Sequence, residues 1–286
     1  MDKGRLNKLV DIQRNEITEH YIYKKLASSV KGDNRKALEK VANDELSHYK
    51  FWRGVTSKDV GPNWFRVNLH YFMAKILGLN FSLRLMENGE AGAQVMYSNL
   101  MRQYPRIKHI IRDEEIHERE LLDMIDEERL KYTGSIVLGL NDALVELTGA
   151  LAGFTLALPN PKIVAMAGLV TGIAASMSMA GSEYLSSKER GEKNPLKSTA
   201  YTGITYFLTV LLLITPYLLM NDAIFSLAIT LATAIIVIFL FNFYISVAKN
   251  LPFRKRFIEM AGISLGVAAI NFGIGLLIKQ YFNIQI

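Results

Sequence analysis

The sequence predicts an all-α protein in two parts: a four-helix bundle in residues 1–131 and five membrane-spanning helices in residues 132–286. Two observations support this division. Of the 33 basic and 27 acidic residues in the chain, only 10 and 7 lie in residues 132–286, so this part suits an apolar surrounding. Residues 1–131 instead carry apolar residues at helical spacing among charged ones, as water-exposed amphipathic helices do.

The composition excludes several classes of protein. The chain has no cysteine, which excludes a disulfide framework, thiolate zinc sites, iron–sulfur clusters and cysteine catalysis. A hydrophobic content of 50% excludes a disordered chain. The formal net charge is +6, but the basic residues are mixed with acidic ones or flank apolar segments. We therefore expect no nucleic-acid partner.

Five windows in the C-terminal part are long and apolar enough to cross a bilayer, which takes about 20 residues. The third and fourth contain no charged residue. Pro159-Asn160-Pro161 separates the first window from the second, and Asn221-Asp222 separates the third from the fourth. The predicted spans are residues 136–158, 163–185, 200–220, 223–247 and 257–279.

Basic residues in the short loops predict the orientation, because Lys and Arg accumulate on the cytoplasmic side. The first thirty residues are charged and lack the apolar core of a signal peptide. We therefore expect a multi-pass protein, in a plasma membrane, with residues 1–131 in the cytoplasm. The basic residues lie after the second window (Lys188, Arg190, Lys193, Lys197) and after the fourth (Lys249, Arg254, Lys255, Arg256).

Ionisable residues inside a bilayer are costly, so each is a functional candidate. Asp142 and Glu146 lie one helical turn apart in the first window, and Glu183 lies near the cytoplasmic end of the second. Met179 lies one turn deeper than Glu183, and Asp142 and Met179 share a depth of about 12 Å. Carboxylates and a thioether at matched depths predict a path for a transition-metal cation. The alternative is that these acids only hold the helices together.

The N-terminal part predicts helices over residues 5–30, 34–54, 80–103 and 105–131, with a long connection beginning at Gly61-Pro62. The connection contains an unusually apolar stretch from Phe65 to Leu85. This stretch either packs on the bundle or lies on the membrane surface.

Two Glu-x-x-His pairs, Glu45…His48 and Glu114…His117, suit one metal each because a three-residue spacing places both side chains on one helix face. One Glu from each of two helices and one Glu-x-x-His from each of two others form the ferritin-like dinuclear arrangement. Such ligands suit iron or manganese. The alternative is a set of ordinary solvated helix faces. The other two predicted helices supply Glu16, Glu19, Glu87 and Glu90.

At these positions residues 1–131 resemble the rubrerythrin branch of the ferritin-like superfamily. The resemblance implies a dinuclear iron or manganese site without an organic cofactor. It also implies that Glu16 rather than Glu19 is the ligand on the first helix, and that Tyr23 lies beside the site. A rubredoxin-like module would need cysteines, so we do not expect electron transfer of the usual rubrerythrin type. The residues that carry the resemblance are Asn15-Glu16, Tyr23, Glu45, His48, Glu87, Glu90, Glu114 and His117.

Residues 134–286 resemble the vacuolar iron transporter family, through the segments 139–144 (GLNDAL) and 178–184 (SMAGSEY). The resemblance implies a dimer with five spans that moves Fe(II) or Mn(II) out of the cytosol in exchange for protons. It implies that Asp142, Met179 and Glu183 line the path. Two departures stand out. The connection at 186–199 is too short for the helical metal-binding insert of many relatives, and Glu146 stands where we expect an uncharged residue.

These observations predict a membrane exporter of Fe(II) or Mn(II), with a cytoplasmic ferritin-like domain that binds, senses or hands on the metal. The alternative is a membrane-anchored diiron ferroxidase or peroxide-scavenging enzyme. A third hypothesis is that metal occupancy of the bundle gates the spans. The sequence leaves open the choice between iron and manganese, and the number of protons exchanged.

Overall fold

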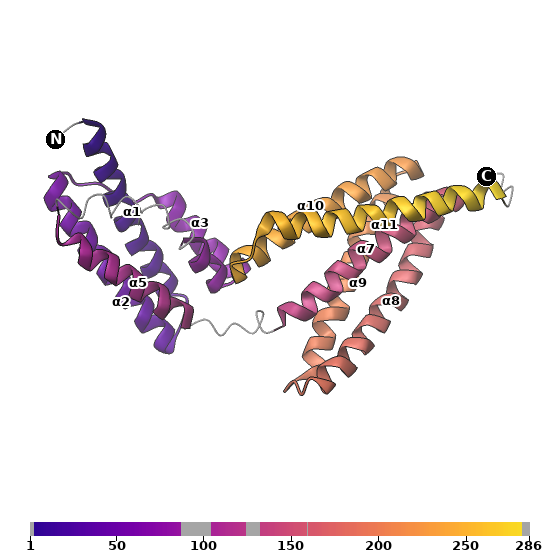
Figure 1. Cartoon of the computed structure of the whole chain (residues 1–286), viewed down its shortest axis with the longest axis horizontal. Helices are drawn as coiled ribbons and strands as arrows, with labels where there is room; N and C mark the ends of the chain where they lie inside the picture. The colour runs from indigo at the N-terminus through magenta and orange to yellow at the C-terminus, as the bar shows by residue number, and fades with distance from the viewer. Residues whose placement is uncertain (1–2, 87–103, 124–131, 159, 282–286) are drawn as a thin grey trace. The chain divides into compact units, whose positions relative to one another are not determined.

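The structure is a computed structural model that describes residues 3–86, 104–123, 132–158 and 160–281 (Figure 1). Within these ranges every regular element is a helix. The chain divides into two compact units. The first comprises residues 1–127 with 247–250, and the second comprises 128–246 with 251–286.

The helices of the N-terminal unit include α1 (Lys3–Ala27), α2 (Gly32–Thr56), α3 (Trp64–Leu77) and α5 (Ile107–Asp123). Residues 79–86 are also helical. Helix α2 packs on α1 and α5, and α3 packs on α1. The helices predicted over 5–30 and 34–54 correspond to α1 and α2. Most of the helix predicted over 80–103 lies outside the described residues, so the four-helix bundle stays a prediction.

Helix α3 differs from the long connection that the sequence predicted after Gly61-Pro62. The Asn63 side chain caps this helix by accepting a hydrogen bond from the backbone N–H of Arg66 at 3.2 Å. Val67 and His70 are buried, so one side of α3 belongs to the unit's interior. Because a short apolar helix and an apolar connection differ little in composition, the contact with α1 is what distinguishes them.

Two apolar clusters hold the N-terminal unit together, and each draws on α1, α2 and α5. Between the clusters each helix carries polar buried side chains, among them Glu16, Glu45 and His117. The apolar packing therefore presents ligand-type residues from three helices at one level. One cluster contains Leu9, Ile12, Trp52, Ile107 and Ile110. The other includes Ile22, Leu26, Leu38, Val41 and Leu121.

The C-terminal unit contains five helices long and apolar enough to cross a membrane (Figure 1). This finding confirms the five predicted spans and makes the chain a multi-pass membrane protein. The helices are α7 (Thr133–Ala157), α8 (Pro161–Glu189), α9 (Pro195–Leu219), α10 (Ala223–Lys249) and α11 (Phe253–Tyr281).

The helix ends lie where the sequence predicted breaks. Asn160 caps α8 by accepting a hydrogen bond from the backbone N–H of Lys162 at 2.8 Å, and Pro161 is the first helical residue. Asp222 accepts from the backbone N–H of Phe225 at 2.6 Å at the start of α10. Such caps satisfy amide groups that have no partner within the helix.

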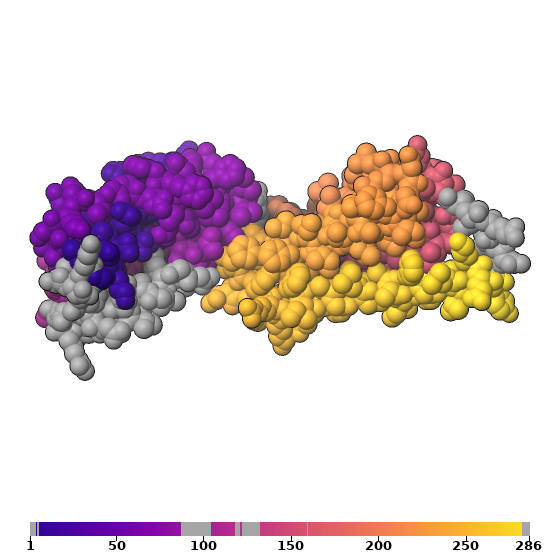
Figure 2. Space-filling view, turned by 90° about the horizontal axis from the view of Figure 1, so that it is seen from above, coloured from indigo at the N-terminus to yellow at the C-terminus, as the bar shows by residue number. Residues whose placement is uncertain are grey.

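Helix α7 is central in the C-terminal unit, because it packs on α8, α9 and α11. Helix α10 is joined to α9 by the Thr230 hydroxyl, which donates to the Leu213 carbonyl at 3.0 Å. Figure 2 shows α10 and α11 side by side on one face. Large apolar side chains on α11 are exposed, which fits contact with lipid hydrocarbon. They include Ile258, Ile263, Ile270 and Leu277.

Gly139 marks the closest approach of α7 to α9. A methyl group on its Cα would collide with the backbone carbonyl of Thr202, which cannot rotate away. We expect Gly139→Ala to destabilise the protein by about 1–3 kcal/mol, as overpacked positions do. Thermal unfolding of the purified protein measures this. Gly181→Ala is the matched control because nothing lies within 4 Å of its added methyl group. Equal unfolding temperatures for the two variants would contradict the close approach.

Candidate metal centre and membrane carboxylates

Four side chains of the N-terminal unit converge on one point between α1, α2 and α5. Glu16, Glu45, His48 and Glu114 each offer a ligand atom, and these atoms lie within 4.8 Å of one another. The first three side chains are 2–4% exposed. Burying three carboxylates beside an imidazole costs free energy unless a cation neutralises them. The arrangement is therefore chemically suited to a metal ion.

Glu45 and Glu114 each approach both imidazole rings. Glu45 directs Oε2 to Nδ1 of His48 at 3.4 Å and Oε1 to Nδ1 of His117 at 3.5 Å. Glu114 directs Oε1 to Nδ1 of His48 at 3.4 Å and Oε2 to Nδ1 of His117 at 3.8 Å. Two carboxylates shared between two imidazoles suit a pair of metal ions with one histidine each.

The Nε2 atom of each imidazole lies near a carboxylate on the other helix. Nε2 of His117 on α5 lies 2.9 Å from Oδ2 of Asp44 on α2. Nε2 of His48 on α2 lies 3.4 Å from Oδ2 of Asp113 on α5. Such contacts orient a ligating imidazole and raise its basicity. In addition, the Trp52 indole N–H donates to Oε1 of Glu16 at 3.1 Å.

The Nδ1 atoms of the two histidines, which face the centre of the cluster, show whether a metal ion fits there. Nδ1 of His48 and Nδ1 of His117 are buried, and neither has a hydrogen-bond partner among the described residues. Each instead faces carboxylate oxygens at distances outside good hydrogen-bond geometry. A metal ion would occupy this space and satisfy both nitrogens. The residues present therefore fit a divalent cation with mixed oxygen and nitrogen ligands.

Without a metal, protons neutralise the cluster. Burial lowers the pKa of His117. The neighbouring carboxylates of Glu114, Glu45 and Asp44 outweigh this effect and raise the pKa of His117 to about 10. The pKa of His48 is raised in the same way, against burial, by Glu114, Glu16 and Glu45. Burial raises the pKa of Glu16. At neutral pH both imidazoles are therefore protonated, and their positive charges partly replace the charge of a metal cation.

The sequence analysis missed Asp44, Asp113 and Trp52. A signal for the first two was present, because both pairs extend to the pattern Asp-Glu-x-x-His at 44–48 and 113–117. Tyr23 is buried in the apolar cluster of Ile22 and Leu26, and its place beside the metal ligands stays a prediction. Glu87 and Glu90 lie outside the described residues.

In the membrane unit, Glu183 of α8 is 4% exposed and joins α8 to the start of α7. Its Oε1 accepts from the Ser135 hydroxyl at 2.7 Å and from the Arg190 guanidinium at 3.0 Å. The sequence did not predict Ser135 and Arg190 as hydrogen-bond partners of Glu183. Glu183 therefore hydrogen-bonds both to α7 and to the end of its own helix. Its part in transport stays a prediction.

The carboxylates of α7 lie farther along this helix than Ser135, the residue that contacts Glu183. Asp142 follows Ser135 by seven residues, which is about 10 Å along the helix. The buried Tyr206 of α9 donates its hydroxyl to Oε2 of Glu146 at 2.7 Å. Met179 is half-buried against the core of the unit. No hydrogen bond or ion pair joins these predicted path residues to one another in the described ranges, so a shared ion path stays a prediction.

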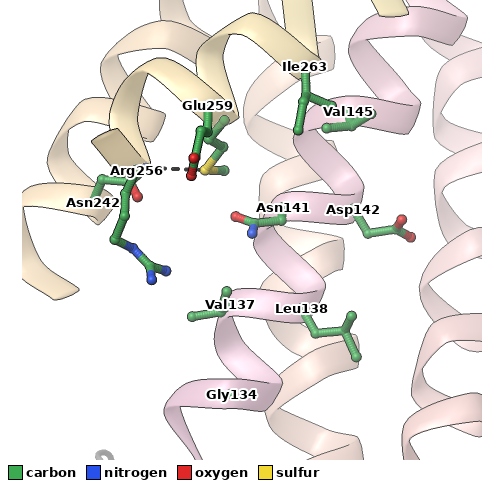
Figure 3. Close-up of a pocket in the computed structure, with 11 residues that line it drawn as sticks. Gly134, Val137, Leu138, Asn141, Asp142, Val145, Asn242, Arg256, Glu259 and Ile263 are labelled. Carbon is green, nitrogen blue, oxygen red and sulfur yellow. Dashed lines mark hydrogen bonds between the residues drawn. The ribbon is translucent and has the colours of Figure 1, made fainter. Parts of the chain in front are cut away.

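Asp142 borders a cavity of ≈ 590 Å³ between α7, α10 and α11. Figure 3 shows the Asn141 side chain directed toward α11, whereas Asp142 points away from Arg256 and Glu259. Oδ1 of Asn141 is buried and has no hydrogen-bond partner among the described residues. The cavity lies toward the end of the unit where α7 and α11 begin, and Asn141 is its buried polar side chain without a described partner.

These features define a multi-pass membrane protein with carboxylates inside its spans and a buried ligand cluster in its N-terminal unit. A sequence profile of the VIT family matches residues 133–192, which comprise α7, α8 and the start of the loop that follows. The match indicates a membrane metal-ion transporter. It agrees with the predicted resemblance to vacuolar iron transporters and contains Asp142, Met179 and Glu183. No curated protein matches the chain.

Proposed function

We propose that the protein exports Fe(II) or Mn(II) from the cytosol in exchange for protons. The observation that carries the proposal is the VIT-family match over α7 and α8, because the matched segment holds carboxylates at two depths of the membrane unit. Asp142 and Glu146 would bind the cation at the deeper level. Glu183 would lie nearer the membrane edge, and Met179, at the predicted depth of Asp142, would supply a softer ligand. Protonation of these acids would release the ion and couple its movement to the proton gradient.

The N-terminal unit would act as a cytoplasmic ferritin-like domain that collects the metal. Its support is the cluster of Glu16, Glu45, His48 and Glu114, which presents mixed oxygen and nitrogen ligands in a buried setting. The basic loops after α8 and α10 support a cytoplasmic position for this unit. The resemblance to vacuolar iron transporters supports a homodimer as the working form, and the short loops favour a plasma membrane.

Metal flux into proteoliposomes of the full-length protein tests the proposal. Fe(II) and Mn(II) are followed separately, with and without a pH gradient. We expect saturable uptake, enhanced when the vesicle interior is acidic, because protons then leave as the cation enters. The preferred ion identifies the substrate. The absence of flux for both ions would contradict an exporter.

A second candidate function is a membrane-anchored diiron ferroxidase or peroxide scavenger. The observation that favours it is the sharing of Glu45 and Glu114 between two imidazoles, since paired iron sites with such ligands react with oxygen or peroxide. Oxygen and peroxide consumption by the full-length protein with added Fe(II) tests it. Consumption no faster than that of free iron counts against the enzyme.

Metal binding to the N-terminal cluster is expected to release protons. The raised pKa of His117, about 10, means that this imidazole keeps its proton through the neutral range, and the metal must displace it. The same holds for His48. Metal affinity should therefore rise as the pH increases toward 10 and fall as the pH decreases. Calorimetric titrations in buffers of different ionisation enthalpy measure the protons released. Binding heats that do not depend on the buffer would contradict this expectation.

A further inference from the structure

Helix α3 presents an apolar stripe that is exposed among the described residues of its unit. Phe65, Leu69, Phe72 and Ile76 form the stripe, and their side chains are 75%, 39%, 60% and 52% exposed. At about 100° per residue, these four positions fall within about 60° of one another on the helix. Four large apolar side chains on a single face are more than the scattered exposure normal for a soluble surface.

The stripe lies opposite the side of α3 that packs on the unit. Val67 and His70 are buried, and they lie roughly half a turn around the helix from the stripe. The packing on α1 therefore fixes α3 with its apolar stripe directed outward. The exposure does not result from a loosely held segment.

Positive charge flanks the stripe. Helix α3 contains no acidic residue. The ammonium groups of Lys25 and Lys75 lie 4.7 and 4.9 Å from the centre of the Tyr71 ring, about 100° around the helix from Phe72 at the edge of the stripe. Trp64, 55% exposed, lies at the same end as Phe65. Aromatic and aliphatic side chains on one face, with Lys beside them, are typical of helices that lie in a membrane interface.

We infer that α3 is an interfacial helix whose stripe inserts into the headgroup region of the lipid bilayer. Charge complementarity favours lipid over a second protein surface, because Lys25 and Lys75 match the anionic headgroups of a cytoplasmic leaflet. The two units are also linked by a short stretch of chain, since α5 ends at Asp123 and Thr133, ten residues later, begins a membrane span. That distance in sequence allows a reach of about 36 Å at most.

The chain contains two tryptophans, which permits a direct test. Trp52 is fully buried, so a Trp52→Phe background leaves Trp64 as the reporter of α3. The full-length protein is reconstituted in vesicles of phosphatidylcholine and phosphatidylglycerol with acyl chains brominated near the headgroup. We expect about a twofold loss of Trp64 emission in brominated lipid and little quenching by aqueous iodide. Replacing phosphatidylglycerol by phosphatidylcholine should weaken the lipid quenching.

Two variants in this background sharpen the test. Phe72→Gln with Ile76→Gln should lower the lipid quenching and admit iodide, because both changes make the stripe polar. Arg35→Gln, an exposed change on α2, is the matched control and should leave the signal unchanged. Quenching by iodide alone in the Trp52→Phe protein would overturn the inference. Protection from both quenchers would also overturn it, because protein rather than lipid would then cover the stripe.

Discussion

Replacing Glu45 by alanine is expected to abolish metal binding by the N-terminal unit. Glu45 approaches Nδ1 of both histidines, so its loss removes a ligand from each half of the cluster at once. Outer partners of metal ligands already contribute about 10–100-fold in affinity, so a shared ligand should contribute about 100-fold or more. The measurement is metal bound per chain, by equilibrium dialysis with Mn(II) and with anaerobic Fe(II).

Glu39→Ala is the matched control for this prediction. Glu39 lies on the same helix, is exposed, and pairs with Arg35 at 2.8 Å on the surface of α2. Because an exposed pair of this kind contributes little to stability, the control should bind metal as the native protein does. Unchanged binding by Glu45→Ala would show that the cluster is a set of polar side chains and not a metal centre.

Replacing Asp142 by asparagine is expected to reduce metal flux to the level of protein-free vesicles. The change keeps the shape of the side chain and removes its negative charge. A divalent cation inside a low-dielectric span needs that charge to offset the loss of its hydration. The variant should still fold, because no described hydrogen bond or ion pair of Asp142 holds the helices together. Flux in proteoliposomes, with thermal unfolding as a check on folding, measures both effects.

Asp222→Asn is the control for this variant. Asp222 lies between α9 and α10, where it caps α10 through the backbone N–H of Phe225. Asparagine caps helices as well as aspartate does, so folding and flux should both persist. Native flux in Asp142→Asn would show that Asp142 is not part of the transport path.

The elements that depend on local pattern could be predicted from the sequence. The five spans follow from length and composition, and the structure contains all five. The Glu-x-x-His pairs at 45–48 and 114–117 follow from helical spacing, and their side chains do converge. Helix α3 could not be separated from an apolar connection, because its contact with α1 is formed between segments distant in sequence.

Contacts between helices were beyond prediction for the same physical reason. Which residue of α5 meets His48 depends on how far each helix rotates about its axis, and spacing within one helix does not determine that rotation. The repeated Asp-Glu-x-x-His pattern therefore marks Asp113 but does not identify His48 as its partner. In the same way, Ser135 meets Glu183 only after α7 and α8 have packed, whereas Arg190 lies at the end of the same helix as Glu183.

The crossed contacts of Asp44 with His117 and of Asp113 with His48 have a consequence for how the cluster fills. The five-residue units at 44–48 and 113–117 make the same kinds of contact with each other, because each supplies the carboxylate beside the other's histidine. Neither helix alone supplies both a histidine and the carboxylate that contacts the Nε2 atom of that histidine. A first ion would draw α2 and α5 into register and prepare the position of the second, so intermediate occupancy should be scarce. The cluster would then respond to metal supply over a narrow range of concentration, as a threshold device does.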